Sequence, residues 1–185
     1  MAPQLIRKSS PKRFGTVAIA FHWVSAGLIL TMLTTGVMSA SIADESVKAS
    51  LLRIHVIVGV ALFALTVARV VWRVRGDPSP DSFPGQRRWD WMAERTVRVL
   101  LYLSVFAAIG SGIATILIAG AELPLFGSGT LALPDFETAP GFSIHSTAAG
   151  ILLLLSIGHG GAALWHQLIA KQRVLARIGI GRPRR

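Results

Sequence analysis

The sequence predicts an all-α membrane protein, a bundle of four transmembrane helices. Of its 185 residues, 52% are hydrophobic and only 15% are charged, which is unusual for a soluble domain. Four apolar stretches are long enough to cross a bilayer core, which takes about 20 residues in a helix. Most charged residues gather between these stretches, and the exceptions are four arginines: Arg53, Arg69, Arg73 and Arg98. We expect one integral membrane domain over residues 1–185.

The expected spans lie near residues 17–38, 51–74, 97–119 and 143–169, with tails at 1–16 and 170–185. Lys and Arg concentrate in both tails and between the second and third spans. The other two loops are mainly acidic, with Asp44, Glu45, Glu122, Asp135 and Glu137. The positive-inside rule therefore predicts that both termini are cytoplasmic and that the acidic loops face outward. All five tryptophans fall on the predicted cytoplasmic side, as an aromatic belt would.

Several other classes of protein are excluded by the same pattern. The formal charge of +10 does not form the continuous basic patch of a nucleic-acid-binding protein, because no Lys or Arg occurs between Arg98 and Lys171. Basic blocks separated by long neutral runs instead suit the orientation of a membrane protein. The absence of cysteine excludes disulfides, iron–sulfur clusters and covalently attached c-type haem. A cleavable signal peptide is the competing interpretation of the N-terminus. The apolar run over 17–38 is longer than a usual signal core of about 7–15 residues, which favours a retained helix.

All five histidines lie inside or at the ends of the predicted spans: His22, His55, His145, His159 and His166. Ionisable residues within a membrane are rare and usually functional. The alternative for any single histidine is a hydrogen bond to a neighbouring helix. Five histidines in one small bundle favour a functional arrangement.

The spacing of the histidines predicts two stacked sites. His145 and His159 lie fourteen residues apart, so they share a helical face and are separated by about 21 Å along the axis. Counting depth from the flanking charges pairs His22 with His159 near the cytoplasmic side. The same count pairs His55 with His145 near the outer side. His166 remains unpaired near the interface.

Two imidazoles per site match the needs of a haem iron, which already has four equatorial nitrogens and takes two axial ligands. Zinc usually takes three or four protein ligands, and the four spans contain no Asp or Glu. Two b haems with iron bound by His22, His55, His145 and His159 are therefore expected, and the filled coordination favours electron transfer over oxygen activation. His166 is expected at the headgroup level or against a haem propionate. Small residues within the spans suit either a flat macrocycle or helix packing: Gly27, Gly59, Gly150, Gly158, Gly160 and Gly161. The alternative function is a non-redox metal-ion transporter lined by histidines.

The chain resembles the bacterial cytochrome b561 family of four-helix membrane proteins with two b haems. The resemblance rests on "FHW" at 21–23, "IHVIVG" at 54–59, "ARVVWR" at 68–73, "PLFGSGTLALP" at 124–134, "IHSTAAG" at 144–150 and "GHGGAALWHQ" at 158–167. It also includes Tyr102 and Gly112 in the third span. In this family the positions of the four paired histidines hold the haem ligands. The chain departs from the family in the third span, where Arg95 and Arg98 replace histidines and Ile109 replaces a proline.

The resemblance implies electron transfer between a donor at the outer, periplasmic face and the membrane quinone pool, in the bacterial inner membrane. Ubiquinone is the implied quinone. One type of relative is a superoxide:ubiquinone oxidoreductase, and others are membrane subunits that accept electrons from separate dehydrogenases. Both alternatives stay open at this point, and so does the question of whether the chain is itself an enzyme. A homodimer is compatible with the sequence, which shows no strong interface motif.

Three arginines are candidates for pairing with haem propionates: Arg53, Arg69 and Arg73. Arg53 and Arg73 lie near span ends, so the alternative for both is extension of the charged group toward the interface. Arg69 lies deeper, where an unpaired Arg costs about 2.5–3.5 kcal/mol on the mildest insertion scale, so a partner is expected. The acidic outer loops favour a donor protein with a basic docking face, although Arg53 could attract an anion such as superoxide.

Overall fold

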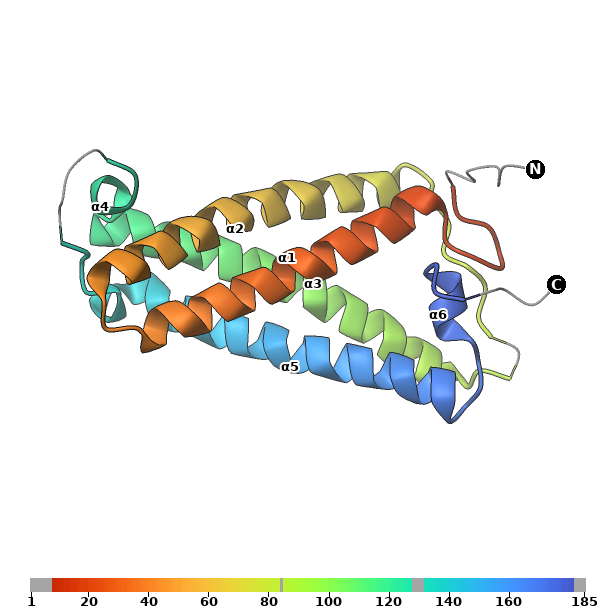
Figure 1. Ribbon diagram of the computed structural model, residues 1–185. Helices are drawn as coiled ribbons and strands as arrows, with labels where there is room; N and C mark the ends of the chain where they lie inside the picture. The colour runs from red at the N-terminus through yellow and green to blue at the C-terminus, as the bar shows by residue number, and fades with distance from the viewer. Residues whose placement is uncertain (1–7, 84, 128–131, 182–185) are drawn as a thin grey trace.

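The computed structural model describes residues 8–83, 85–127 and 132–181. Four long helices run along one another in these residues: α1 (Thr16–Ser41), α2 (Glu45–Val74), α3 (Arg88–Ala119) and α5 (Pro140–Leu168) (Figure 1). Three short elements lie in the connections: α4 (Glu122–Phe126), the 3₁₀ turn η1 (Phe136–Thr138) and α6 (Val174–Arg177). All four long helices are apolar enough and long enough to cross a membrane. The predicted class, all-helical with four such helices, is confirmed.

The long helices contain the predicted spans except for Ile169, which follows the end of α5. All four begin before the predicted spans, α1 and α5 by three residues or fewer, α2 and α3 by six and nine. α2 begins at Glu45 because the carboxylate of Asp44 accepts hydrogen bonds from the backbone N–H groups of Ser46 and Val47. The hydroxyl of Ser46, followed by these backbone N–H groups, lowers the pKa of Asp44 below its usual value.

The third long helix, α3, begins at Arg88, before the apolar run of its span. Its first turns are stabilised by polar contacts that suit an aqueous interface. Arg98 pairs with Glu94 one turn earlier, and the Arg95 guanidinium lies 5.5 Å from the ring centroid of Trp91. These contacts extend the helix beyond the apolar stretch from which its start was predicted.

The helices pack as two pairs. α1 packs along α2 and α3 packs along α5, much more extensively than either pair packs on the other. Gly141 allows the closest approach within the second pair, since a Cβ there would lie 2.7 Å from Oγ1 of Thr115. Several hydroxyl groups inside the helices bond to the preceding turn, as Thr35 does to the carbonyl of Thr31, which satisfies them in an apolar environment. The buried hydroxyl of Ser25 in α1 is an exception among the described residues, since it has no hydrogen-bond partner.

A small apolar core joins the two pairs near the middle of the bundle. It contains Leu62 of α2, Val105 and Ile109 of α3, and Leu152 of α5, all buried. Many large apolar side chains on the outer surface remain exposed, such as Leu154 at 70%. That surface suits contact with lipid, and the mid-bundle core separates the two ends of the molecule.

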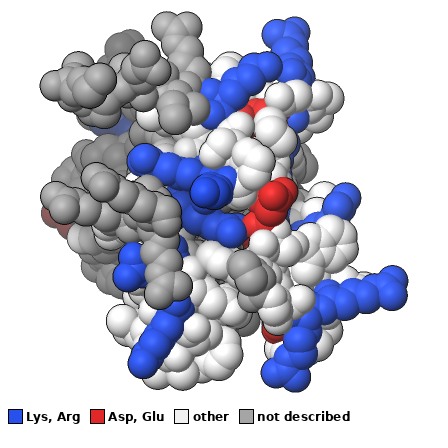
Figure 2. Space-filling view, turned by 90° about the vertical axis from the view of Figure 1, so that its right-hand side faces the viewer, with Lys and Arg blue, Asp and Glu red and all other residues white. Residues whose placement is uncertain are grey.

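The two ends of the bundle differ in charge. One end, here called the basic end, is formed by residues 8–15, 75–83, 85–87 and 170–181, and Lys and Arg side chains spread over it with few acidic ones (Figure 2). The opposite end, here called the loop end, contains residues 42–44, α4, η1 and their flanking segments (Figure 1). Some predicted features lie outside the described residues: Arg7, Arg182, Arg184, Arg185 and positions 128–131 of the outer-loop motif.

Candidate functional site

Four histidines from three helices meet in two pairs. The rings of His22 on α1 and His159 on α5 have centroids 6.4 Å apart with planes inclined by 67°. The rings of His55 on α2 and His145 on α5 have centroids 5.9 Å apart with planes inclined by 71°. The structure thus brings together the pairs expected from depth. His22–His159 is the basic-end pair, and His55–His145 is the loop-end pair.

Hydrogen bonds determine the tautomers of the loop-end pair. Nδ1 of His145 lies 2.7 Å from the carbonyl oxygen of Ala108, which can only accept, so the ring donates its Nδ1–H. Nδ1 of His55 lies 3.1 Å from Oγ1 of Thr35. The Thr35 hydroxyl already donates to the carbonyl of Thr31, so it accepts from His55. In the neutral form of both rings Nε2 is therefore the unprotonated nitrogen, the one with which an imidazole can bind a metal.

Two glycines lie directly against the rings of the loop-end pair. A Cβ at Gly112 of α3 would lie 2.9 Å from Nδ1 of His145, and a Cβ at Gly36 of α1 would lie 3.2 Å from Cε1 of His55. Either side chain would push on an imidazole. Thr35 and Gly36 were missed as site residues from the sequence, and Gly112 was noted only as a family feature. The sequence does show a hydroxyl and small residues within the spans. Recognising them as neighbours of the histidines would require knowing how the helices are aligned against one another.

The basic-end pair is positioned differently. In the described residues, no hydrogen bond to a ring nitrogen of His22 or His159 is seen. The rings of Trp23 and His22 instead pack edge to face, with centroids 5.2 Å apart. The guanidinium of Arg69 is within electrostatic range of both histidines, and that of Arg98 is within range of His159.

The three candidate arginines have identifiable partners in the protein. Arg69 lies 5.6 Å from the ring centroid of Tyr102, a cation–π contact. Arg73 donates to the carbonyl of Asp77 at 3.3 Å. Arg53, at the loop end, donates from Nε to the carbonyl of Leu125 in α4 at 2.5 Å. Arg73 thus contacts the basic end, Arg69 lies one turn before it on α2, and Arg53 contacts the loop end.

The fifth histidine, His166, lies at the end of α5 rather than in either pair. Its Nδ1 is 2.8 Å from Oε1 of Gln172, and its ring packs against Trp165 with centroids 4.9 Å apart. The structure places it at the basic-end surface, and a role toward a propionate stays a prediction.

Comparison with known proteins identifies the group to which this arrangement belongs. The sequence profile of the family described as prokaryotic cytochrome b561 matches residues 13–181, which include both histidine pairs. The chain belongs to this family. Membership supports a membrane electron-transfer function with haem b as cofactor, and with the four apolar helices it indicates a multi-pass membrane protein.

Individual relatives match the b561-family chain over nearly its whole length. Cytochrome b561 homolog 2 of Escherichia coli K12 is 29% identical over 175 residues, covering 92% of this chain and 93% of the relative. Cytochrome b562 of Cereibacter sphaeroides is 29% identical over 166 residues, covering 86% and 90%. Cytochrome b561 homolog 1 of Escherichia coli K12 is 27% identical over 173 residues, covering 90% and 96%.

The separation of the rings in both pairs leaves room for a metal between two imidazoles, since the centroids lie 6.4 and 5.9 Å apart. A haem iron, whose macrocycle supplies four nitrogens, would need only the two histidines of a pair. Zinc would need further ligands, and in the described parts of the chain no three His, Cys, Asp or Glu side chains gather as a metal site.

The span glycines of this b561-family chain were expected either to allow close helix packing or to leave room for a flat macrocycle, and the structure divides them. A Cβ at Gly59 would lie 3.2 Å from Cε of Met32, so this glycine serves helix packing. Open space surrounds the corresponding position at five others: Gly27, Gly150, Gly158, Gly160 and Gly161. These five are compatible with a bulky group beside the helices or with lipid contact.

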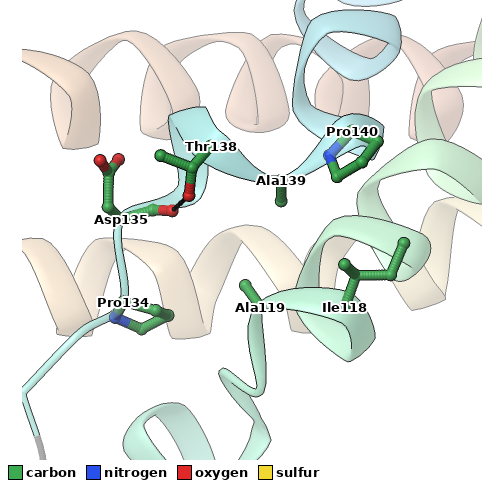
Figure 3. A pocket seen from close by; sticks show the side chains of 7 residues that line it. All are labelled: Ile118, Ala119, Pro134, Asp135, Thr138, Ala139 and Pro140. Atoms are coloured by element: carbon green, nitrogen blue, oxygen red, sulfur yellow. Dashed lines mark hydrogen bonds between the residues drawn. The ribbon is translucent and has the colours of Figure 1, made fainter.

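The loop end of the chain also has a small surface pocket of about 240 Å³, lined by residues 118–119, 134–135 and 138–140 (Figure 3). Among the described lining residues Asp135 is the ionisable one, and its carboxylate accepts a hydrogen bond from the backbone N–H of Glu137. The Thr138 hydroxyl donates to the Asp135 carbonyl at 2.8 Å. These bonds stabilise the turn η1, and the pocket contains no histidine of either pair.

Proposed function

We propose that this chain is a two-haem cytochrome b that carries electrons across the membrane between a donor at its outer face and the quinone pool. The observation that carries the proposal is the presence of two histidine pairs at opposite depths, each joining α5 to a helix of the other pair. Each pair would supply both axial ligands of one haem b, which provides one-electron chemistry when bound.

The protein's own contribution is to hold the ligands and exclude water. His145 and His159 are on one helix, so their separation of about 21 Å along α5 is determined by the helix itself. Leu152, halfway between them, is buried with Leu62, Val105 and Ile109. This apolar layer would separate the two haems and deny protons and ions a path between the ends.

The arginines support the proposed placement of the haem carboxylates. Arg53 would serve the loop-end haem, since it precedes His55 by two residues on α2 and bonds to α4. Arg69 and Arg73 would serve the other haem, since they follow on the same helix toward the basic end. Guanidinium groups are well suited to binding carboxylates. Arg69, whose one partner seen among the described residues is the aromatic ring of Tyr102, is the residue for which a propionate would be most favourable.

The distribution of charge supports the orientation and the location. The Lys- and Arg-rich end would face the cytoplasm and the loop end the periplasm of a bacterial inner membrane (Figure 2). The acidic residues of the loop end favour a protein donor with a basic docking surface over superoxide.

Anaerobic reoxidation of the purified protein tests the function. The chain, reduced with dithionite and freed of excess reductant, is mixed with a soluble ubiquinone analogue in a stopped-flow spectrometer. We expect the reduced haem bands to disappear with a rate that saturates in quinone. A rate that matches that of free haem in the same detergent would contradict quinone reduction. Parallel reduction by superoxide and by a basic electron-carrier protein, each at two ionic strengths, separates the donors, because steering by the acidic end weakens with salt.

A further inference from the structure

Trp23 joins a histidine of the basic-end pair to the C-terminal tail of the chain. Its ring contacts that of the preceding His22 edge-on, with planes inclined by 73°. Although its side chain is 43% exposed, its Nε1–H donates to the carbonyl of Ile178 at 2.9 Å. The indole is therefore fixed on one side by the tail and contacts the imidazole on the other.

The tail itself is anchored by contacts from two other segments of the basic end. The backbone N–H of Phe14 donates to the carbonyl of Arg177 at 3.2 Å. The Arg177 guanidinium lies 3.5 Å from the ring centroid of Phe83 and donates to the carbonyl of Asp81 at 2.6 Å. These contacts hold the residue next to Ile178, so the acceptor for Trp23 is part of a fixed structure.

Gly179 brings the tail close to α1. Its φ is +95°, a conformation that L side chains rarely adopt, and a Cβ there would lie 3.3 Å from Cγ2 of Ile19. Gly181 has a similar φ of +92°, but nothing lies within 4 Å of its Cβ position. A side chain at either glycine would therefore strain the backbone. Of the two, only Gly179 lies against α1, the helix that carries His22.

His22 differs from the loop-end histidines in what orients it. His55 and His145 each donate from Nδ1 to a protein acceptor, the usual way in which a metal-binding imidazole is oriented. In the described residues His22 has no such bond, and its contact with Trp23 takes that place.

We propose that Trp23 is a positioning residue for His22 and that the tail turn at 178–179 holds it in place. The inference rests on the proposed role of His22 as an axial haem ligand. If Trp23 positions His22, the angle between the imidazole planes of His22 and His159, 67° in the structure, depends on the hydrogen bond from Trp23 to the C-terminal tail.

Electron paramagnetic resonance of the oxidised full-length protein tests this, because the anisotropy of a low-spin ferric haem depends on the angle between its two imidazole planes. Trp23→Phe keeps an aromatic ring and removes the N–H. We expect it to retain two haems and to shift or broaden one low-spin signal, the one missing in His22→Ala. Trp165→Phe is the matched control, since Trp165 packs on His166 in the same way, and it should change neither signal.

A second pair of variants tests the tail without touching Trp23. Gly179→Val should displace the tail from Ile19 and reproduce the shift, while Gly181→Val should not. Unchanged spectra in Trp23→Phe with both haems bound would overturn the proposal. If Trp23→Phe does not accumulate, identical spectra from the two glycine variants would overturn it. Retention of both haems by His22→Ala would instead refute the ligand assignment in the proposed function.

Discussion

Gly112 offers a sharp test of how closely the bundle is fitted around its loop-end pair. The change Gly112→Ala adds one methyl group to α3, facing α5. In the structure that carbon would lie 2.9 Å from Nδ1 and 3.0 Å from Cε1 of His145, whereas ordinary contact begins at 3.4 Å. The ring must move by about half an ångström, and the same movement disturbs its 2.7 Å hydrogen bond to the Ala108 carbonyl.

The expected cost follows from the packing. Adding a methyl group to a well-packed position costs about 1–3 kcal/mol. If that cost falls on the haem-bound state, it corresponds to a loss of about 5–150-fold in affinity at the loop-end site. Gly110→Ala is the matched control on the same helix, because nothing lies within 4 Å of its Cβ position. That control should gain up to about 1 kcal/mol of helix stability.

The assay is haem content per chain after purification, followed by the rate at which apomyoglobin removes haem. Gly112→Ala should lose haem from one site faster than the wild type does, while Gly110→Ala should behave like the wild type. Equal haem loss from the two variants would refute the account of His145 as a tightly packed ligand.

Three further predictions concern other residues. His159→Ala should bind one haem per chain and His166→Ala two, as measured by the pyridine haemochrome assay; the reverse result would exchange their roles. Thr35→Val should weaken haem binding at the loop-end site by about 10–100-fold, because His55 loses its hydrogen-bond acceptor, and unchanged haem retention would show that this bond is dispensable. Asp44→Ala should lower the melting temperature at neutral pH. The native carboxylate has a lowered pKa, so its stabilisation is present above the unfolded-state value of about 3.9 and is lost as the pH falls through the native value. The difference between the variant and the wild type should therefore disappear in acid, and a difference that persists there would contradict this explanation.

The sequence was sufficient for the fold class because bilayer thickness imposes a length that few other structures require. The early start of α2 was missed because Asp44 was taken for a loop charge rather than a helix cap. The early start of α3 was missed because polarity marks the end of a membrane span and not the end of a helix. Arg95 and Glu94 lie in the helix although they precede its apolar part.

The histidine pairs could be predicted because depth in a membrane is encoded by distance from the flanking charges. The residues that orient them could not. Thr35 lies beside His55 only through the register of α1 on α2, and the carbonyl of Ala108 carries no side-chain signal at all. The contact between Trp23 and the tail joins residues 155 positions apart, and nothing local to either indicates it.

The number of haems bound per chain decides whether the two histidine pairs are haem sites. A pyridine haemochrome assay on the purified full-length protein, set against protein concentration from amino-acid analysis, gives that number. We expect two non-covalent b haems per chain, with the low-spin spectrum of two histidine ligands at each iron. One haem per chain would mean that one histidine pair is not a haem site. A haem-free protein that binds a bare metal ion would contradict the cytochrome account and favour the transporter.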